Sequence, residues 1–159
     1  MKKNIFVTTG SVLHFDFLIK LIDSVNFNNK YNIIAQIGKG KYIPKNLKCF
    51  KFTTNISKYY GWADIIITHT GGTTLSEICL LNKKAIAISN PLGYKGIYEI
   101  AQKFDELGYL KYVDFKNIDG KFADFEKIIR DVLDGKYKFK KYTRKKQAIG
   151  QEIIKFLDL

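Results

Sequence analysis

Short apolar runs alternate along the chain with segments in which apolar residues recur every three or four positions. The runs predict β-strands and the spaced segments predict helices. Strands are expected at residues 4–8, 31–38, 49–52, 62–68, 85–89 and 109–113. Helices are expected at residues 15–25, 56–60, 73–81, 97–107 and 122–133, with a helical tail from about 138 to 159. This alternation predicts an α/β fold, a Rossmann-like parallel sheet with helices on both faces.

Turn-forming residues follow three of the predicted strands. They are Gly10 with Ser11, residues 69–74, and residues 90–96, which begin with Asn90. The carboxyl ends of parallel strands lie at one edge of a sheet, and ligands of such folds bind there. The sequence therefore favours a nucleotide or another phosphate ligand at this edge.

The central stretch, residues 63–77, predicts a strand, a tight glycine turn and a helix. Gly71 and Gly72 allow positive φ and a close approach of a ligand to the backbone, and Thr73 or Thr74 is expected to cap the helix. A helix N-terminus offers free N–H groups and a partial positive charge, so it is an anion site. The alternative is a turn that needs glycine for its geometry alone.

Composition indicates one globular domain of 159 residues. No apolar run is long enough for a transmembrane helix, and the N-terminus does not continue as a signal peptide. Cys49 and Cys79 are predicted to be buried thiols in a reducing compartment rather than a disulfide. With only His14 and His69 besides, no metal site is expected.

The net charge of +12 comes from two stretches. Residues 28–58 hold seven lysines and no acidic residue, and residues 136–146 hold seven lysines or arginines and no acidic residue. Elsewhere, acidic residues slightly outnumber basic ones. Such stretches attract phospholipid headgroups, nucleic acid or an acidic partner. The alternative is a lysine-rich solvated surface.

Several segments together resemble a known family. They are 6–11 with 15–18, 35–38 with 41–44, 63–77, 90–92, 99–101 and 107–110. In this order and spacing, over about residues 4–113, they resemble the C-terminal, donor-binding domain of GT-B glycosyltransferases of the family 28 type. The chain is similar above all to the small subunits of two-component enzymes, which serve dolichol-linked chitobiose synthesis or bacterial exopolysaccharide and capsule synthesis.

The resemblance implies a donor-binding, catalytic subunit that transfers a hexose from a UDP-sugar to a polyprenyl-diphosphate-linked acceptor, with no cofactor. A membrane-anchored partner subunit would bind the acceptor and hold this chain at the cytoplasmic face of the membrane. Residues 1–135 would form the nucleotide-sugar domain, and residues 136–159 a basic helical tail that faces the partner or an anionic membrane.

The resemblance also implies roles for individual residues. Gly10, Ser11 and residues Gly71, Gly72, Thr73 and Thr74 would bind the diphosphate, and Glu77 would bind the ribose hydroxyls. The alternative for Glu77 is that its charge only complements the dipole of the helix. Asn90 and Glu99 lie in segments shared with the family and are expected near the donor. His69 and His14 are the candidates for the general base, although either could be structural and the base could belong to the partner.

Three departures from the family pattern bear on these roles. Thr73 replaces a common glycine, Gly96 and Ile97 replace a common His-Gln pair that would contact the donor sugar, and Ala85 replaces a common proline. The second departure leaves the sugar open. It also keeps one alternative, a non-catalytic subunit that stabilises a membrane glycosyltransferase. The positive charge and the tyrosines of the tail keep another, a basic nucleic-acid-binding α/β protein.

Overall fold

A computed structural model describes residues 2–25, 27, 30–118 and 121–143 of the chain. Six strands form one sheet in the order β3-β2-β1-β4-β5-β6, and all five neighbouring pairs are parallel. The strands are β1 Lys3–Thr8, β2 Tyr31–Gln36, β3 Lys48–Phe50, β4 Ile65–His69, β5 Ala85–Ile88 and β6 Lys111–Val113. The predicted Rossmann-like sheet is confirmed.

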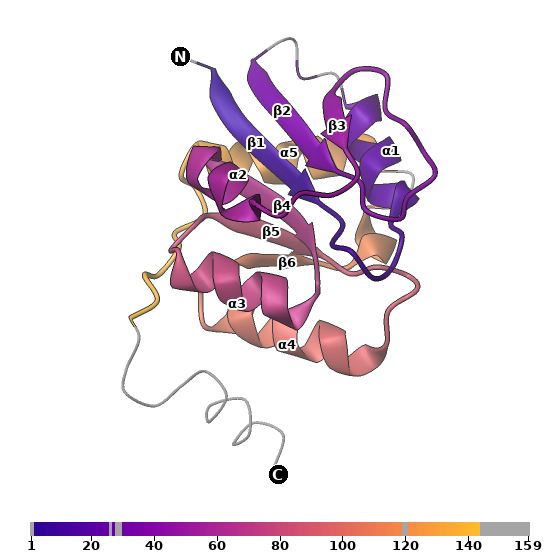
Figure 1. Ribbon diagram of the computed structural model, residues 1–159. Coiled ribbons are helices and arrows are strands. Elements are labelled where there is room, and N and C mark those ends of the chain that lie inside the picture. The colour runs from indigo at the N-terminus through magenta and orange to yellow at the C-terminus, as the bar shows by residue number, and fades with distance from the viewer. Residues whose placement is uncertain (1, 26, 28–29, 119–120, 144–159) are drawn as a thin grey trace.

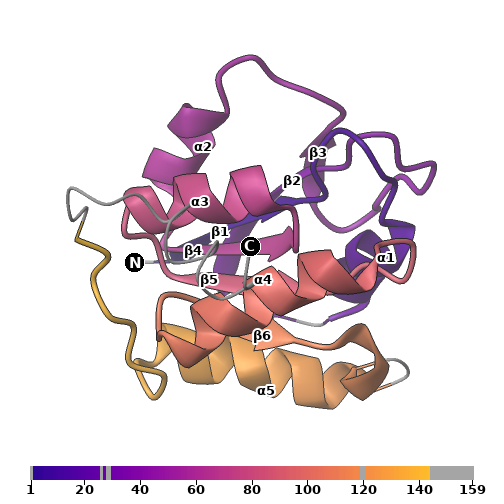
Figure 2. The ribbon, with the colours of Figure 1, turned by 90° about the horizontal axis from the view of Figure 1, so that it is seen from below.

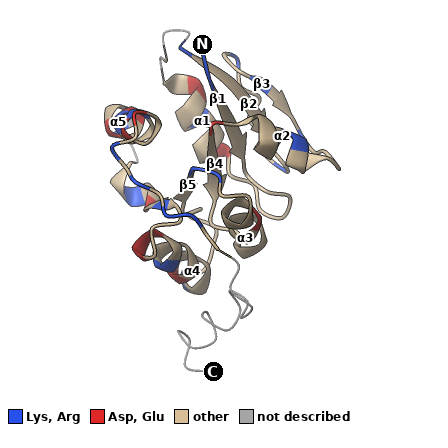
Figure 3. Ribbon diagram, turned by 90° about the vertical axis from the view of Figure 1, so that its left-hand side faces the viewer, with Lys and Arg blue, Asp and Glu red and all other residues tan. Residues whose placement is uncertain are grey.

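Helices cover both faces of this sheet (Figure 1). They are α1 Asp16–Ser24, α2 Ile56–Trp62, α3 Gly72–Leu80, α4 Lys95–Glu106 and α5 Phe122–Leu133, with a short 3-10 turn at Phe115–Asn117. Figure 3 shows α1 and α5 on one side of the sheet and α2 and α3 on the other. Figure 2 shows α3 and α4 side by side on that second side.

The alternation of side chains along each strand divides the core in two. On β1 and β4, Val7 and Ile67 pack with α1 and α5, whereas Phe6 and Ile66 pack with α2, α3 and α4. Because both faces are covered, the central strands are apolar at nearly every position. Ile5 to Val7 and Ile65 to Ile67 are fully buried.

The order in which strands are added to the sheet reverses between β1 and β4. From β1 the sheet grows one way through β2 and β3, and from β4 it grows the other way through β5 and β6. The loop after β1 leads to α1 and the loop after β4 leads to α3, on opposite faces. This arrangement opens a crevice at the carboxyl ends of the two strands.

The described part of the basic tail differs from its prediction. Residues 138–143 form no helix, so that part of the prediction is wrong, and residues 144–159 lie outside the described residues. The Lys140 amide donates to the Gly108 carbonyl at 2.8 Å. Asn82 and Tyr142 exchange two hydrogen bonds, of 2.6 and 3.2 Å. In this segment, hydrogen bonds to the domain therefore take the place of hydrogen bonds within a helix.

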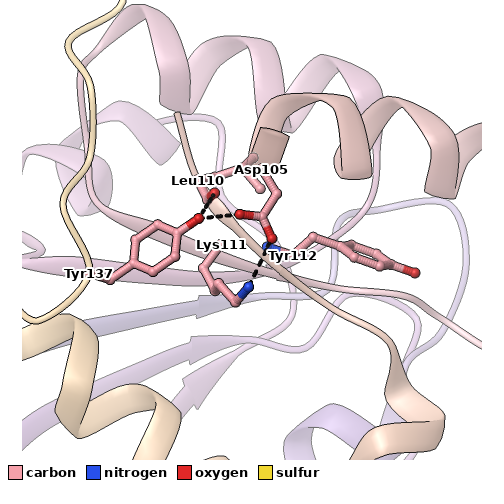
Figure 4. Close-up of polar contacts among 5 residues, drawn as sticks. All are labelled: Asp105, Leu110, Lys111, Tyr112 and Tyr137. Carbon is pink, nitrogen blue, oxygen red and sulfur yellow. Dashed lines mark hydrogen bonds and ion pairs between the residues drawn. The ribbon is translucent and has the colours of Figure 1, made fainter. Parts of the chain in front are cut away.

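Tyr137 anchors the start of this segment on the domain (Figure 4). Its hydroxyl donates to Asp105, which also accepts from the Lys111 ammonium and the Tyr112 amide, each at 3.0 Å. Lys111 lies over the Tyr137 ring, 5.3 Å from its centroid. Tyr137, Phe139 and Tyr142 pack against the core of the domain. The domain boundary at residue 135 remains a prediction.

The first basic stretch is a solvent-exposed surface. Its seven lysines are all exposed, and buried carboxylates hold the backbone between them. Asp23, 7% exposed, accepts from the Tyr42 hydroxyl at 2.6 Å and from the Asn46 amide at 2.8 Å. Burial raises the pKa of Asp23, but these hydrogen bonds outweigh it and lower the pKa overall. The loop that carries Lys41 and Lys45 is thus fixed, since the backbone amides of both lysines also donate to Asp16 or Asp23.

Candidate functional site

A cavity of about 480 Å³ lies in the crevice at the carboxyl ends of β1 and β4, where the strand order reverses. Its walls come from the ends of β1, β2 and β4, the loops after β1 and β3, α2, and the start of α3. Of the predicted site residues, the structure brings together Gly10, Ser11, His69, Gly71, Gly72, Thr73, Thr74 and Glu77 around this cavity.

His69 fills the centre of the crevice because glycines flank it on two sides. A Cβ atom on Gly10 would lie 2.5 Å from Cε1 of the His69 ring, and a Cβ atom on Gly71 would lie 2.3 Å from its Nε2. Gly10 also has φ +72°, whereas Gly71 has φ −66°. Gly71 does not use the positive φ that a glycine allows, and the close approach that it permits is to an imidazole of the chain itself.

The His69 ring is half-buried and lies against the end of its own strand. Its Nδ1 is 3.3 Å from the Thr68 hydroxyl. Burial lowers the pKa of His69, and a hydrogen bond with the Thr8 backbone raises it by less. The ring is therefore neutral at pH 7.

The N-terminus of α3 forms one wall of the cavity. The N-cap is Gly71, and no described side chain caps the helix, so the predicted cap at Thr73 or Thr74 is wrong. Both threonines are instead in the first turn, and the first intrahelical bond runs from the Leu75 amide to the Gly71 carbonyl at 3.0 Å. The amides of the first turn are therefore available to an anion.

Glu77 and Tyr60 form a polar cluster on the same wall. The Tyr60 side chain is 2% exposed, and its hydroxyl makes side-chain hydrogen bonds with Thr74 and Glu77. Burial and the charge of Glu77 raise the pKa of Tyr60 to about 12. A neutral phenol beneath Glu77 can hold the carboxylate in position while Glu77 itself remains exposed at the cavity.

Sequence reasoning missed several other lining residues. Phe52, 64% exposed, lies in the loop after β3 with Thr53 and Thr54, and Gln36 ends β2. The sequence did contain a signal for them, because both lie at the carboxyl ends of strands of the same parallel sheet. An exposed aromatic ring beside a cavity is a surface on which a planar base stacks.

Three predicted site residues lie outside the cavity lining. Asn90 is 5% exposed; its amide donates to the His14 carbonyl at 2.9 Å and its oxygen accepts from the Leu92 amide at 3.1 Å. Glu99 pairs with Lys95 on α4 at 3.5 Å, and His14 is exposed. Their contacts are with the chain itself, and their roles toward a ligand remain predictions.

A larger cavity, of about 740 Å³, lies at the opposite edge of the sheet, among residues such as Lys2, Tyr31 and Trp62 at the amino ends of the strands. Parallel sheets bind ligands at their carboxyl ends, so the smaller cavity is the candidate site. Over residues 2–25, 27, 30–118 and 121–143, no three histidine, cysteine or carboxylate side chains gather as a metal site would need. In the same part of the chain, no helix is long and apolar enough to cross a bilayer.

Relatives among characterised proteins share this sequence pattern. A "UDP-N-acetylglucosamine--N-acetylmuramyl-(pentapeptide) pyrophosphoryl-undecaprenol N-acetylglucosamine transferase" of Finegoldia magna is 27% identical over 146 residues, which are 82% of this chain and 39% of that protein. The UDP-N-acetylglucosamine transferase subunit ALG13 of Candida albicans is 26% identical over an alignment covering 96% of this chain and 73% of the subunit. The chain thus spans about two fifths of the length of the first relative.

Solved structures share the fold. MurG of Acinetobacter baumannii superposes with a TM-score of 0.63 at 20% identity, over 84% of this chain and 43% of MurG. A solution structure of ALG13 superposes with a TM-score of 0.61 at 20% identity, over 90% of each chain.

The family match covers nearly the whole chain. The glycosyltransferase family 28 C-terminal domain matches residues 4–157, whereas the sequence resemblance was expected to end near residue 113. The basic tail therefore lies within the match. The chain belongs to the glycosyltransferase family 28 C-terminal domain family.

Proposed function

We propose that this chain is the donor-binding subunit of a glycosyltransferase that transfers a sugar from a UDP-sugar to a polyprenyl-diphosphate-linked acceptor. The observation that carries the proposal is the cavity at the β1/β4 reversal, where an uncapped helix N-terminus and an exposed carboxylate share one wall. Both named relatives are N-acetylglucosamine transferases, so UDP-N-acetylglucosamine is the proposed donor. Surface polysaccharide synthesis is the proposed setting.

The diphosphate is placed at the start of α3. Among the residues that the structure describes, no lysine or arginine lines the cavity, so the first-turn amides of α3 and the hydroxyls of Ser11, Thr73 and Thr74 supply the attraction. Fixed N–H dipoles stabilise negative charge that develops on the departing diphosphate. The Thr73 side chain, exposed where the family commonly has glycine, is positioned to add a hydroxyl to this set.

The nucleoside is placed between the loop after β3 and the wall formed by α2 and α3. Phe52 offers a ring for stacking with the base, and Glu77 offers a carboxylate to the ribose diol. Because Tyr60 makes a hydrogen bond with Glu77 from below, the carboxylate is held for that contact. The donor sugar would then extend toward the loop after β5 and the first turn of α4, where Gly96 and Ile97 leave its recognition open.

Transfer with inversion needs a base that takes the proton of the acceptor hydroxyl. His69 lines the cavity. Its lowered pKa favours the neutral imidazole at pH 7, which is the protonation state that a base requires. Its ring is also packed between Gly10 and Gly71, and this packing favours a structural role. We therefore assign the base to the partner subunit.

Exposed apolar side chains on the carboxyl edge support a protein partner there. Val12, Phe52, Leu92 and Tyr94 are 74%, 64%, 53% and 70% exposed and come from three loops of this edge. Large apolar side chains gathered on one edge mark an interaction surface. The proposed occupant is the acceptor-binding subunit, which would close the cleft over the donor.

Calorimetric titration of the chain with UDP tests the proposal, with Glu77→Ala measured in parallel. The proposal predicts saturable binding that weakens in the variant while the melting temperature stays the same. Absence of binding by the wild-type chain, both alone and with the partner subunit, would refute the donor site and leave a structural subunit.

A further inference from the structure

Gln36 is a buried polar side chain with an unmet hydrogen-bonding requirement. It ends β2 and is 2% exposed. Its side-chain oxygen Oε1 is buried and has no hydrogen-bond partner in the part of the chain that the structure describes. Buried polar groups in folded proteins nearly always have a partner, so an exception beside a cavity points to a group that is supplied from outside the chain.

The position of Gln36 places it at the floor of the candidate site. It lies opposite Thr8 in the sheet register, and both residues line the cavity together with Tyr60. Two residues earlier, Ile34 packs on the α2 and α3 side, so Gln36 points to the same side. Its backbone carbonyl is already used by the amide and hydroxyl of Thr9, at 3.1 and 3.3 Å.

The unpaired group is an acceptor, and this narrows what it can bind. A diphosphate at neutral pH offers only acceptors, which suit the N–H groups of α3. A nucleoside offers donors: the ribose hydroxyls and the N–H of uracil. The terminal torsion of glutamine is broad, so the carboxamide can turn its oxygen toward the cavity.

The geometry points to Gln36 as a nucleoside-binding residue that accepts a hydrogen bond from a ribose hydroxyl or from the base N–H. This inference rests on the proposed nucleotide site and deepens it. The cavity then has two halves: donors at the start of α3 hold the phosphates, and acceptors at Gln36 and Glu77 hold the nucleoside.

Gln36→Met tests the inference, because methionine keeps the size of the side chain and removes the acceptor. UDP affinity should fall about tenfold, the cost of one lost hydrogen bond. The melting temperature without ligand should change little, because Oε1 has no hydrogen-bond partner to lose in the part of the chain that the structure describes. Gln102→Met, at an exposed position on α4 outside the lining, is the matched control and should bind UDP as the wild type does.

Nucleotide analogues identify which group of the nucleoside donates the hydrogen bond to Gln36. The wild type is titrated with 2′-deoxy-UDP, 3′-deoxy-UDP and N3-methyl-UDP, and the analogue that lacks the donor should bind both wild type and Gln36→Met equally weakly. Two results would overturn the inference while the proposed function stands. Gln36→Met could bind UDP as tightly as the wild type does, or the wild type could bind UDP and all three analogues with equal affinity. A fall in ligand-free stability with unchanged affinity would show a structural group, for example one that holds a buried water. If the wild type does not bind UDP, the proposed function itself fails.

Discussion

The loops after β4 and β5 carry similar sequence signals, but only the loop after β4 lines the cavity. Each follows a buried strand at the carboxyl edge, contains glycine and leads into a helix without a side-chain cap from the described residues. Residues of the first loop surround the cavity. In the second, the Asn90 side chain bonds to the His14 carbonyl and the Leu92 amide.

The difference comes from where the connecting helices go. The helices after β1 and β4 pack on opposite faces of the sheet, so their loops diverge and leave a crevice. The helices after β4 and β5 pack on the same face, as Figure 2 shows, and no such divergence separates their loops. A carboxyl end is thus necessary for the site, and the reversal between β1 and β4 creates it.

The largest expected effect is that of Gly71→Ala. The new Cβ would meet His69 Nε2 at 2.3 Å, so the ring or the start of α3 must move. We expect UDP affinity to fall at least about a hundredfold, or roughly 3 kcal/mol. Calorimetry measures this, and Gly61→Ala is the matched control, because Gly61 lies outside the cavity lining and its Cβ would meet nothing within 4 Å. Equal losses in the two variants would contradict the packing argument.

Asn90→Ala should act on stability and leave binding unchanged. It removes two hydrogen bonds of a buried amide, so we expect the free energy of unfolding to fall by about 2 kcal/mol. Chemical denaturation measures the loss, and calorimetry should give a UDP affinity within twofold of the wild type. A tenfold loss of affinity with little loss of stability would place the second loop in the site after all.

Glu77→Gln should weaken UDP binding by about tenfold, or 1.4 kcal/mol, because a carboxylate accepts from a diol more strongly than an amide does. Since Glu77 is exposed, the melting temperature should not change. Glu99→Gln is the control from the second loop's helix. An equal effect of both substitutions, or none of either, would contradict the assignment of Glu77.

The smallest expected effect is the pH dependence due to His69. Burial lowers its folded-state pKa below the ordinary value of 6.5. Its contribution to stability is therefore fully present above about pH 6.5 and is lost as the pH falls toward the folded-state pKa, because the unfolded chain takes up the proton first. As the pH is lowered from 7.5 to about 5, the melting temperature should fall less steeply in His69→Gln than in the wild type. His14→Gln, at an exposed position, is the control, and a wild-type slope in His69→Gln would refute the effect.

The fold could be predicted from the sequence because buried parallel strands are apolar at nearly every position. Ile65 to Ile67 is such a strand, and the glycines at 71 and 72 mark its end. The β4–α3 part of the site followed from the same signals. Asn90 could not be separated from Gly71 in this way, because the face on which each helix packs is a tertiary property.

Three further differences have local causes. Thr73 was expected to cap α3, but the need to clear His69 makes Gly71 the N-cap. The tail was expected to be helical from about residue 138, but Tyr137 and Tyr142 bond to Asp105 and Asn82 of the domain. Gln36 lies in a segment shared with the family, residues 35–38, but only its burial beside the cavity shows which of these residues faces the site.

The most direct test of the account is an amide NMR titration of the full chain with UDP. The account predicts shifts concentrated at residues 10–12, 36, 52–54 and 71–77, with residues 90–99 and the amino-edge cavity near Tyr31 unaffected. Shifts centred on residues 90–99 or on the amino edge would contradict the claim that the reversal between β1 and β4 forms the nucleotide site.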